Sequence, residues 1–229
     1  MNKISIKVQD GCSQNCSYCI VRELRGKSQS YSYQDICKDI DFFINKLDCK
    51  TFDLCGVNTL EYYHVSIGDF IDLCKSLSNK YAGIDFIIDN INPFDKNKVY
   101  RLIDLVKETH NISKELFISI QSASNNLLKA MHRPYTKESL YDIFNYAKIN
   151  NIIIKTEIIV GFPGEIESDF EETYDFLKFF GVNFTAHVYS NRPGTEAAEK
   201  YTDIIPEEVI LSRINKYRKL QKDIECQQN

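Results

Sequence analysis

The chain has 229 residues, of which 43% are hydrophobic and 26% are charged, as is typical of a soluble globular protein. Its net charge of −4 argues against a domain that grips nucleic acid unaided, because phosphate binding calls for a basic face. It contains neither an apolar run of the roughly 18–20 residues that span a bilayer nor a signal-peptide core at the N-terminus. We therefore expect a cytoplasmic protein with a single domain over residues 1–229.

Short β-branched, apolar runs alternate with longer amphipathic stretches along the chain. Strands are expected at 4–9, 51–56, 84–89, 116–121, 152–161 and 183–189. Helices are expected near 33–47, 67–79, 94–108, 137–149, 167–180 and 206–225. Start signals support several of them: Ser124, Thr136 and Ser168 open helical stretches, and Pro206 suits the first turn of the last helix.

Six strand–helix units in series imply an α/β fold with a parallel sheet and right-handed crossovers. The run at 152–161 is apolar on both faces, as buried parallel strands are. Six units fit an open, partial (β/α)6 barrel better than a closed eight-unit barrel, which needs about 250 residues. In either form, functional groups are expected at the C-terminal ends of the strands.

Three of the eight cysteines, Cys12, Cys16 and Cys19, directly follow the first expected strand with C-x3-C-x2-C spacing. Thiolates are soft ligands that suit iron–sulfur clusters or zinc. Structural zinc normally takes four ligands, and the next Cys or His candidates are Cys37 and His64. Three thiolates leave one metal with an open position where a substrate can bind. The alternatives are a zinc site completed by a distant residue and three unrelated thiols in a loop.

This cysteine loop after the first strand of a six-unit partial barrel resembles the radical S-adenosylmethionine superfamily. The resemblance implies that the three cysteines hold a [4Fe–4S] cluster whose fourth iron is chelated by S-adenosylmethionine. An electron from the cluster then breaks the S–C5′ bond, which gives methionine and a 5′-deoxyadenosyl radical. It also implies an external electron donor of the flavodoxin or ferredoxin type. Tyr18 matches the position that usually contacts adenine, with simple packing as the alternative.

Longer segments are similar to the methylthiotransferase family, which modifies transfer RNA. They are residues 8–30, 55–63, 119–136, 158–177 and 188–198, in the expected order over nearly the whole chain. By this resemblance, Gln121 and Ser122 at the end of the fourth strand help to bind S-adenosylmethionine. Gly56-Val57-Asn58 is most similar to the branch that acts on threonylcarbamoyladenosine.

The chemistry of other residues in these segments also suggests what each one does. The planar fork of Arg133 can pair with a carboxylate such as that of the methionine moiety, or with a surface ion-pair partner. Glu157 is a charge within an apolar strand, so it needs partners: ribose hydroxyls, or a salt bridge to a neighbouring strand. The glycines of 161–164 form a tight turn that can approach a ligand closely. Residues 191–195 follow the sixth strand and are expected to line the mouth of the barrel.

The chain also departs from the family. Full methylthiotransferases carry an N-terminal domain with three further cysteines for an auxiliary cluster and a C-terminal RNA-binding domain, and we expect this chain to lack both. A second cluster built from Cys55 and the remaining cysteines is a minority interpretation. Three functions remain open: a methylthiotransferase-like enzyme on transfer RNA, a stand-alone radical enzyme on a small molecule or peptide, and a non-catalytic metal-binding interaction protein.

Overall fold

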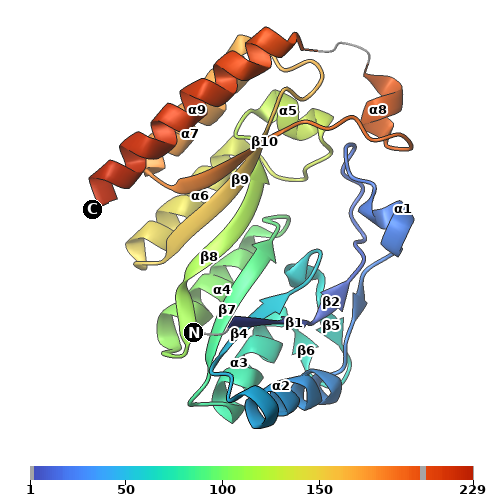
Figure 1. Cartoon of the computed structure of the whole chain (residues 1–229), viewed down its shortest axis with the longest axis vertical. Coiled ribbons are helices and arrows are strands. Elements are labelled where there is room, and N and C mark those ends of the chain that lie inside the picture. Colours follow the sequence, from blue (N-terminus) through green and yellow to red (C-terminus); the bar gives the residue numbers. More distant parts are fainter. Residues whose placement is uncertain (1–2, 202–204, 229) are drawn as a thin grey trace. The chain divides into compact units, whose positions relative to one another are not determined.

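The computed structural model describes residues 3–201 and 205–228 (Figure 1). Six strands form one sheet in the order β1-β4-β7-β8-β9-β10. They are β1 (Lys3–Lys7), β4 (Thr51–Cys55), β7 (Asp85–Ile91), β8 (Ile112–Gln121), β9 (Ile153–Val160) and β10 (Asn183–Val188). The strand pairs β1–β4, β4–β7, β7–β8 and β9–β10 are parallel. This sheet confirms the predicted α/β fold.

Helices separate these strands along the chain. They are α1 (Val21–Arg25), α2 (Tyr33–Leu47), α3 (Phe70–Lys80), α4 (Lys96–Glu108), α5 (Asn125–Ala130), α6 (Lys137–Ile149), α7 (Glu167–Phe180), α8 (Glu196–Lys200) and α9 (Glu207–Gln228), with a 3-10 turn, η1 (Thr59–Glu61). Two short hairpins, β2 (Gln9–Asp10) with β3 (Gln29–Ser30) and β5 (Tyr63–His64) with β6 (Gly68–Asp69), complete the described elements. No helix in the described ranges is long and apolar enough to cross a membrane.

The residue contacts group the chain into two compact units. The first holds the described residues up to Gln14, Val21–Ile118 and Asn145–Ile153. The second holds Asn15–Ile20, Ser119–Phe144 and the described residues from Ile154 onward. One domain over residues 1–229 therefore stays a prediction.

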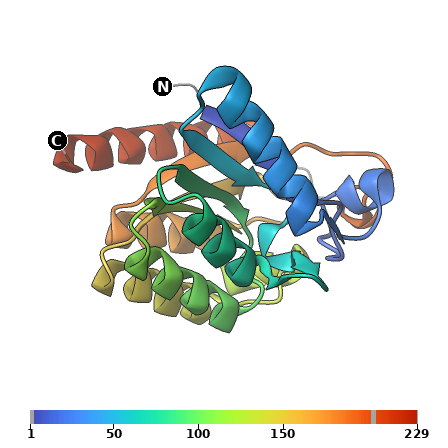
Figure 2. The same cartoon turned by 90° about the horizontal axis from the view of Figure 1, so that it is seen from below.

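In the first unit, period-2 alternation gives the strands one buried apolar face. Ile6, Leu54, Ile88 and Leu116 lie side by side in the strand registers and are fully buried. Figure 2 shows α2, α3 and α4 along one side of these strands. On the other face, Ser5, Asp53 and Ile87 lie side by side, and the Lys3 ammonium lies 3.2 Å from the carboxylate of Asp53.

In the second unit, β9 and β10 pair with Glu157 beside Thr185 and Ile159 beside His187. Helices α7 and α9 contact each other, α9 also contacts β10, and α7 and α9 run side by side in Figure 1. Phe170 of α7 stacks edge to face on Tyr217 of α9, with ring centroids 5.0 Å apart. Tyr217 also contacts Phe184 of β10, with ring centroids 5.6 Å apart, so aromatic contacts join α7, α9 and β10.

Most predicted elements are present, with informative differences at their ends. Helix α2 has the predicted bounds, 33–47. Helix α7 also has the predicted bounds, 167–180, but Ser168 does not open it: Ile166 is the N-cap residue, and the Asp169 carboxylate accepts its N–H at 3.1 Å. Strand β8 begins at Ile112 instead of residue 116, since its first residues pair with β7. The hairpins and the short helices α1 and α8 were not predicted.

Candidate functional site: a cysteine loop beside a polar cavity

A cavity of about 350 Å³ opens in the second unit, at the ends of β8, β9 and β10. It is lined by Tyr18, Cys19, Gln121, Glu157, Ile159, His187, Val188, Tyr189, Ser190 and Arg192. Four residues singled out from the sequence, Tyr18, Cys19, Gln121 and Glu157, thus share one cavity although they are up to 139 positions apart (157 − 18). Its volume is in the range of small-molecule sites.

Glu157 is the polar centre of this cavity. Its Oε1 accepts a hydrogen bond from Gln121 Nε2 at 2.8 Å, and its Oε2 lies 3.3 Å from His187 Nε2. Gln121 adopts a left-handed backbone with φ of 63°, which turns the chain at the end of β8. Glu157 therefore has a neighbouring-strand partner, and its side chain is still 27% exposed towards the cavity. Carboxylate oxygens held in this way can accept hydrogen bonds from a ligand's hydroxyls.

Ser17 anchors the cysteine loop within the second unit. Its N–H donates to Met131 O at 3.2 Å, its hydroxyl donates to Ala130 O at 2.7 Å, and its carbonyl accepts the Ala197 N–H at 2.7 Å. Tyr18, the next residue, packs against the buried cluster of Leu127, Met131, Phe162 and Ala197. Burial raises the pKa of Tyr18 well above its ordinary value, so this phenol stays neutral. Tyr18 thus serves as packing and as a wall of the cavity.

Arg133 lies behind the loop and is buried, with 7% of its surface exposed. Its Nη1 is 3.4 Å from Cys16 Sγ and 3.4 Å from Tyr18 Oη. Arg133 is not among the residues that line the cavity. The structure therefore brings Arg133 to the cysteine loop.

Ser122 is also placed away from the cavity. Its hydroxyl lies 3.1 Å from the Thr173 hydroxyl of α7 and accepts the Ser124 N–H at 3.0 Å. Ser122 and Ser124 are each 1% exposed, so this network is internal. It holds the chain that leaves β8 next to Gln121.

Cys12 belongs to the first unit, where buried Gln9 shapes its loop. Gln9 Nε2 donates to Gly11 O at 2.7 Å, and Gln9 Oε1 accepts the Asn58 N–H at 3.0 Å. Gly11 has φ of 66°, and the Cys12 N–H donates to Gly26 O at 3.1 Å. A Cβ on Gly11 would meet the Lys27 carbonyl oxygen and lie 2.7 Å from that of Gly26. Glycine at position 11 is therefore a steric requirement of this loop.

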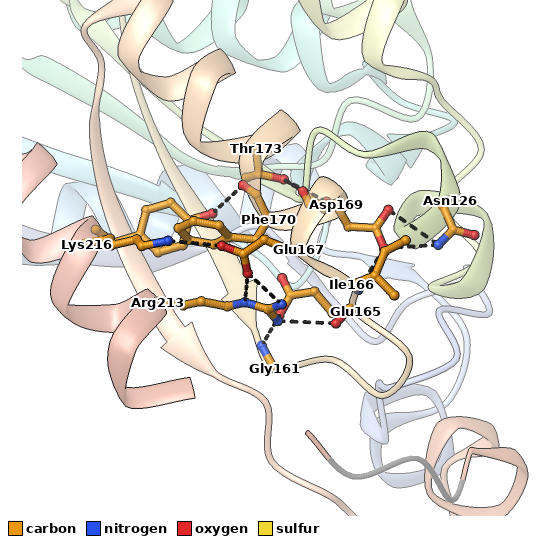
Figure 3. Close-up of polar contacts among 12 residues, drawn as sticks. Asn126, Gly161, Glu165, Ile166, Glu167, Asp169, Phe170, Thr173, Arg213 and Lys216 are labelled. Carbon is orange, nitrogen blue, oxygen red and sulfur yellow. Dashed lines mark hydrogen bonds and ion pairs between the residues drawn. The ribbon is translucent and has the colours of Figure 1, made fainter. Parts of the chain in front are cut away.

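The turn after β9 is held by a buried ion pair, seen in Figure 3. Glu165 Oε2 accepts the Gly161 N–H at 2.7 Å and a hydrogen bond from Arg213 Nη1 of α9 at 2.8 Å. Both side chains are at most 5% exposed. Burial raises the pKa of Glu165, against the opposing effects of the Gly161 amide and Arg213. A Cβ on Gly161 would lie 2.9 Å from the Ile210 side chain, so the turn and α9 touch closely.

A second carboxylate fixes α7 to the segment after β8 (Figure 3). Asp169 Oδ1 accepts a hydrogen bond from the Ser124 hydroxyl at 2.6 Å, and its Oδ2 accepts one from Asn126 Nδ2 at 3.1 Å. Asp169 is 3% exposed. Through these contacts, α7 holds the segment that follows Gln121 at the end of β8.

Several functional residues were missed by the sequence analysis. His187 lies on the predicted strand 183–189, but nothing in the local pattern indicates that it faces Glu157. Residues 191–195 were expected at the mouth: Arg192 lines the cavity, whereas Thr195 is buried and caps α8 by accepting the Ala198 N–H. The Glu165–Arg213 pair joins residues 48 positions apart (213 − 165), a separation that periodicity cannot bridge.

The cysteine thiols are of the ligand type that iron–sulfur clusters take, and their assignment as cluster ligands stays a prediction. All eight cysteines lie in the described part of the chain and none forms a disulfide. Cys12, Cys16 and Cys19 are half-buried, and the N–H of Arg133 points at a candidate ligand sulfur, as donors do around protein iron–sulfur clusters. Within residues 3–201 and 205–228, no three His, Cys, Asp or Glu side chains gather around a single point that could hold one metal ion.

Comparison with known proteins defines the class. The model of the radical SAM superfamily matches residues 6–177, so the chain belongs to this superfamily. Among solved structures, it is similar in fold to the methyltransferase TsrM from Kitasatospora setae, with bound cobalamin and [4Fe-4S] cluster (TM-score 0.67, 14% identity, 85% of this chain and 35% of that one). It is also similar to the Escherichia coli radical SAM enzyme coproporphyrinogen III oxidase (TM-score 0.66, 11% identity, 97% and 52%). These likenesses confirm the predicted partial-barrel fold.

Similar proteins of known name point to one family within the superfamily. The tRNA-2-methylthio-N(6)-dimethylallyladenosine synthase of Natranaerobius thermophilus is 36% identical over 99% of this chain and 51% of the synthase. That of Alkaliphilus oremlandii is 37% identical over 87% of this chain and 43% of the synthase. The chain spans about half the length of the curated relatives it matches. It is consistent with the radical domain of the methylthiotransferase family, as the motifs predicted, although both names give the dimethylallyladenosine branch instead of the one suggested by Gly56-Val57-Asn58.

The superfamily uses a [4Fe–4S] cluster and S-adenosylmethionine, and membership makes the chain a radical SAM enzyme rather than a non-catalytic interaction protein. The predicted cofactors are thereby confirmed at the level of the superfamily.

The Gly11→Ala variant tests the steric account of the Cys12 loop. We expect a loss of about 1–2 kcal/mol from the left-handed backbone and about 1–3 kcal/mol more from the contact with the two carbonyls, measured by chemical denaturation. Gly26→Ala is the matched control, since its φ of 76° is also positive but a Cβ there meets nothing within 4 Å. Equal losses in the two variants would contradict the steric requirement.

The Arg213→Met variant tests the turn after β9. It leaves the buried Glu165 carboxylate without its cation, so we expect unfolding to become easier by about 3–5 kcal/mol in denaturant titrations. Lys216→Met is the control: Lys216 pairs at 3.0 Å with the exposed Glu167, and its loss should cost about 0–1 kcal/mol. Similar losses for the two variants would show that the Glu165–Arg213 pair does not hold the turn.

Proposed function

We propose that this chain binds a [4Fe–4S] cluster through Cys12, Cys16 and Cys19 and reductively cleaves S-adenosylmethionine for C–H activation. The observation that carries the proposal is the cavity in which Cys19 and Tyr18 of the cysteine loop meet Gln121 and Glu157 of the strand ends. A ligand in this cavity contacts the cysteine loop on one side and hydrogen-bonding groups on the other. The bound cluster would supply the electron that breaks the S–C5′ bond into methionine and a 5′-deoxyadenosyl radical.

Different residues of the cavity are suited to different parts of S-adenosylmethionine. Glu157, oriented by Gln121 and His187, is suited to accept hydrogen bonds from the ribose hydroxyls. Tyr18 offers a neutral aromatic surface to adenine. Ser122 contributes by holding the end of β8 through Thr173. Arg133 contacts Cys16 of the cysteine loop, and its pairing with the methionine carboxylate stays a prediction.

The substrate that fits the relatives' names is an adenosine in transfer RNA, to which a methylthio group is added. We propose that the radical domain acts on it together with RNA-binding parts or a helper protein, because the chain carries a net charge of −4. An external donor of the flavodoxin or ferredoxin type supplies the electron. Thiols that form no disulfide suit a reducing cytoplasm.

A stand-alone reaction on a small molecule or peptide is the second candidate, and the net charge of −4, which argues against RNA binding by this chain alone, favours it. Both candidates use the same site residues. Iron content bears on a second cluster: about eight irons per chain supports the first candidate, whereas about four is expected of the second candidate and of a radical domain without the auxiliary-cluster domain.

The cysteine assignment is tested by the Cys16→Ala variant after anaerobic reconstitution. With dithionite and S-adenosylmethionine, the unchanged protein should release 5′-deoxyadenosine, measured by chromatography with mass detection, and Cys16→Ala should lose both the cluster absorbance and the product. Cys226→Ala is the matched control, since Cys226 is exposed on α9. Product from Cys16→Ala would show that the site is wrong, and no product from an intact cluster would overturn the radical mechanism.

A further inference from the structure

Arg133 carries a charge whose position the fold determines closely. It follows α5, where the chain turns through His132 with φ of 56°, and the Arg133 N–H donates to Leu128 O at 2.8 Å. The side chain is 7% exposed. A guanidinium keeps its proton even when buried, so the positive charge is permanent.

The guanidinium is held from two sides. Its Nε donates to the Tyr135 hydroxyl at 2.7 Å, and its Nη2 donates to Ser119 O of β8 at 2.8 Å. Tyr135 in turn donates to Ile120 O at 2.8 Å, and its ring centroid lies 5.1 Å from the guanidinium carbon. The strand β8 and the Tyr135 ring therefore fix the plane of the fork.

The remaining nitrogen, Nη1, points at the cysteine loop, 3.4 Å from Cys16 Sγ. Both sides of this contact are held in place, because the Ser17 hydroxyl and N–H donate to the carbonyls of Ala130 and Met131, three and two residues before Arg133. The cysteine loop is thus joined to the segment that carries Arg133 through Ser17 as well as through Cys16. The contact between a permanent cation and a proposed ligand sulfur is built into the fold.

We propose that Arg133 is a positioning residue that raises the reduction potential of the cluster through its charge and hydrogen bond at Cys16. Reduction adds negative charge to a cluster, and net charge and hydrogen bonds to the sulfurs are among the features that set its potential. A buried cation beside a ligand sulfur stabilises the reduced form more than the oxidised form, since the low local dielectric weakens screening. The inference rests on the proposed function, because it requires the cluster.

This role differs from the carboxylate pairing predicted for Arg133 from the sequence. A guanidinium that binds the methionine carboxylate changes the affinity for S-adenosylmethionine. A guanidinium that acts through Cys16 changes the potential of the cluster when no S-adenosylmethionine is present. The potential without S-adenosylmethionine is therefore the deciding quantity.

The test is a redox titration of the reconstituted protein without S-adenosylmethionine, followed by electron paramagnetic resonance. Arg133→Gln should lower the equilibrium constant for one-electron reduction at least tenfold, which corresponds to a midpoint potential about 59 mV more negative. Arg133→Lys keeps the charge but not the fork and should shift the potential less. Arg218→Gln removes an exposed cation of α9 and should leave the potential unchanged.

The outcomes separate this inference from the proposed function. A loaded Arg133→Gln variant with an unchanged potential overturns the role of Arg133 and leaves the cluster assignment intact. If the unchanged protein takes up no cluster, the proposed function itself fails. If Arg133→Gln loses the cluster, Arg133→Lys decides, because it removes the Nη1 hydrogen bond to Cys16: a lower potential supports the inference, and an unchanged potential overturns it.

Discussion

The anchoring of Ser17 is the contact on which the site of the second unit depends. The Ser17 hydroxyl donates to the carbonyl of Ala130, and the Ser17 N–H donates to that of Met131. The Ser17 carbonyl accepts the N–H of Ala197. Ser17 lies between Cys16 and Tyr18, so its position determines where Cys16 meets Arg133 and where Tyr18 and Cys19 face the cavity. Buried polar groups of this kind are costly to leave unpaired, which makes the loop position specific.

Buried hydrogen bonds also hold the ends of β8 and β9. Gln121 and Glu157 bind each other across β8 and β9, Asp169 of α7 holds the segment after β8, and Glu165 holds the turn after β9. The buried Arg213 then attaches α9 to this turn. The groups proposed to bind the cofactors thus lie on elements with buried hydrogen bonds behind them, an arrangement that holds a ligand in one geometry.

The sequence predicted the strand–helix order and the cysteine loop, because both depend on local patterns: period-2 and 3.6 hydrophobicity, capping residues and C-x3-C-x2-C spacing. Glu157 and Gln121 were also predicted, since a charge in an apolar strand and a polar strand end are visible in the chain. The partners were not: the contacts of Glu157 with His187 and of Arg133 with Cys16 join residues 30 and 117 positions apart. Strand register and loop packing decide such pairs, and single-sequence periodicity carries no information on either.

Electron paramagnetic resonance of the reduced, reconstituted protein, recorded before and after adding S-adenosylmethionine, tests the central claim most directly. The account predicts the signal of a reduced [4Fe–4S] cluster whose g values change when S-adenosylmethionine binds. It also predicts that Glu157→Ala needs a higher S-adenosylmethionine concentration for the same change, because Glu157 lines the cavity. A cluster signal that saturating S-adenosylmethionine leaves unchanged would contradict a shared site for the two cofactors.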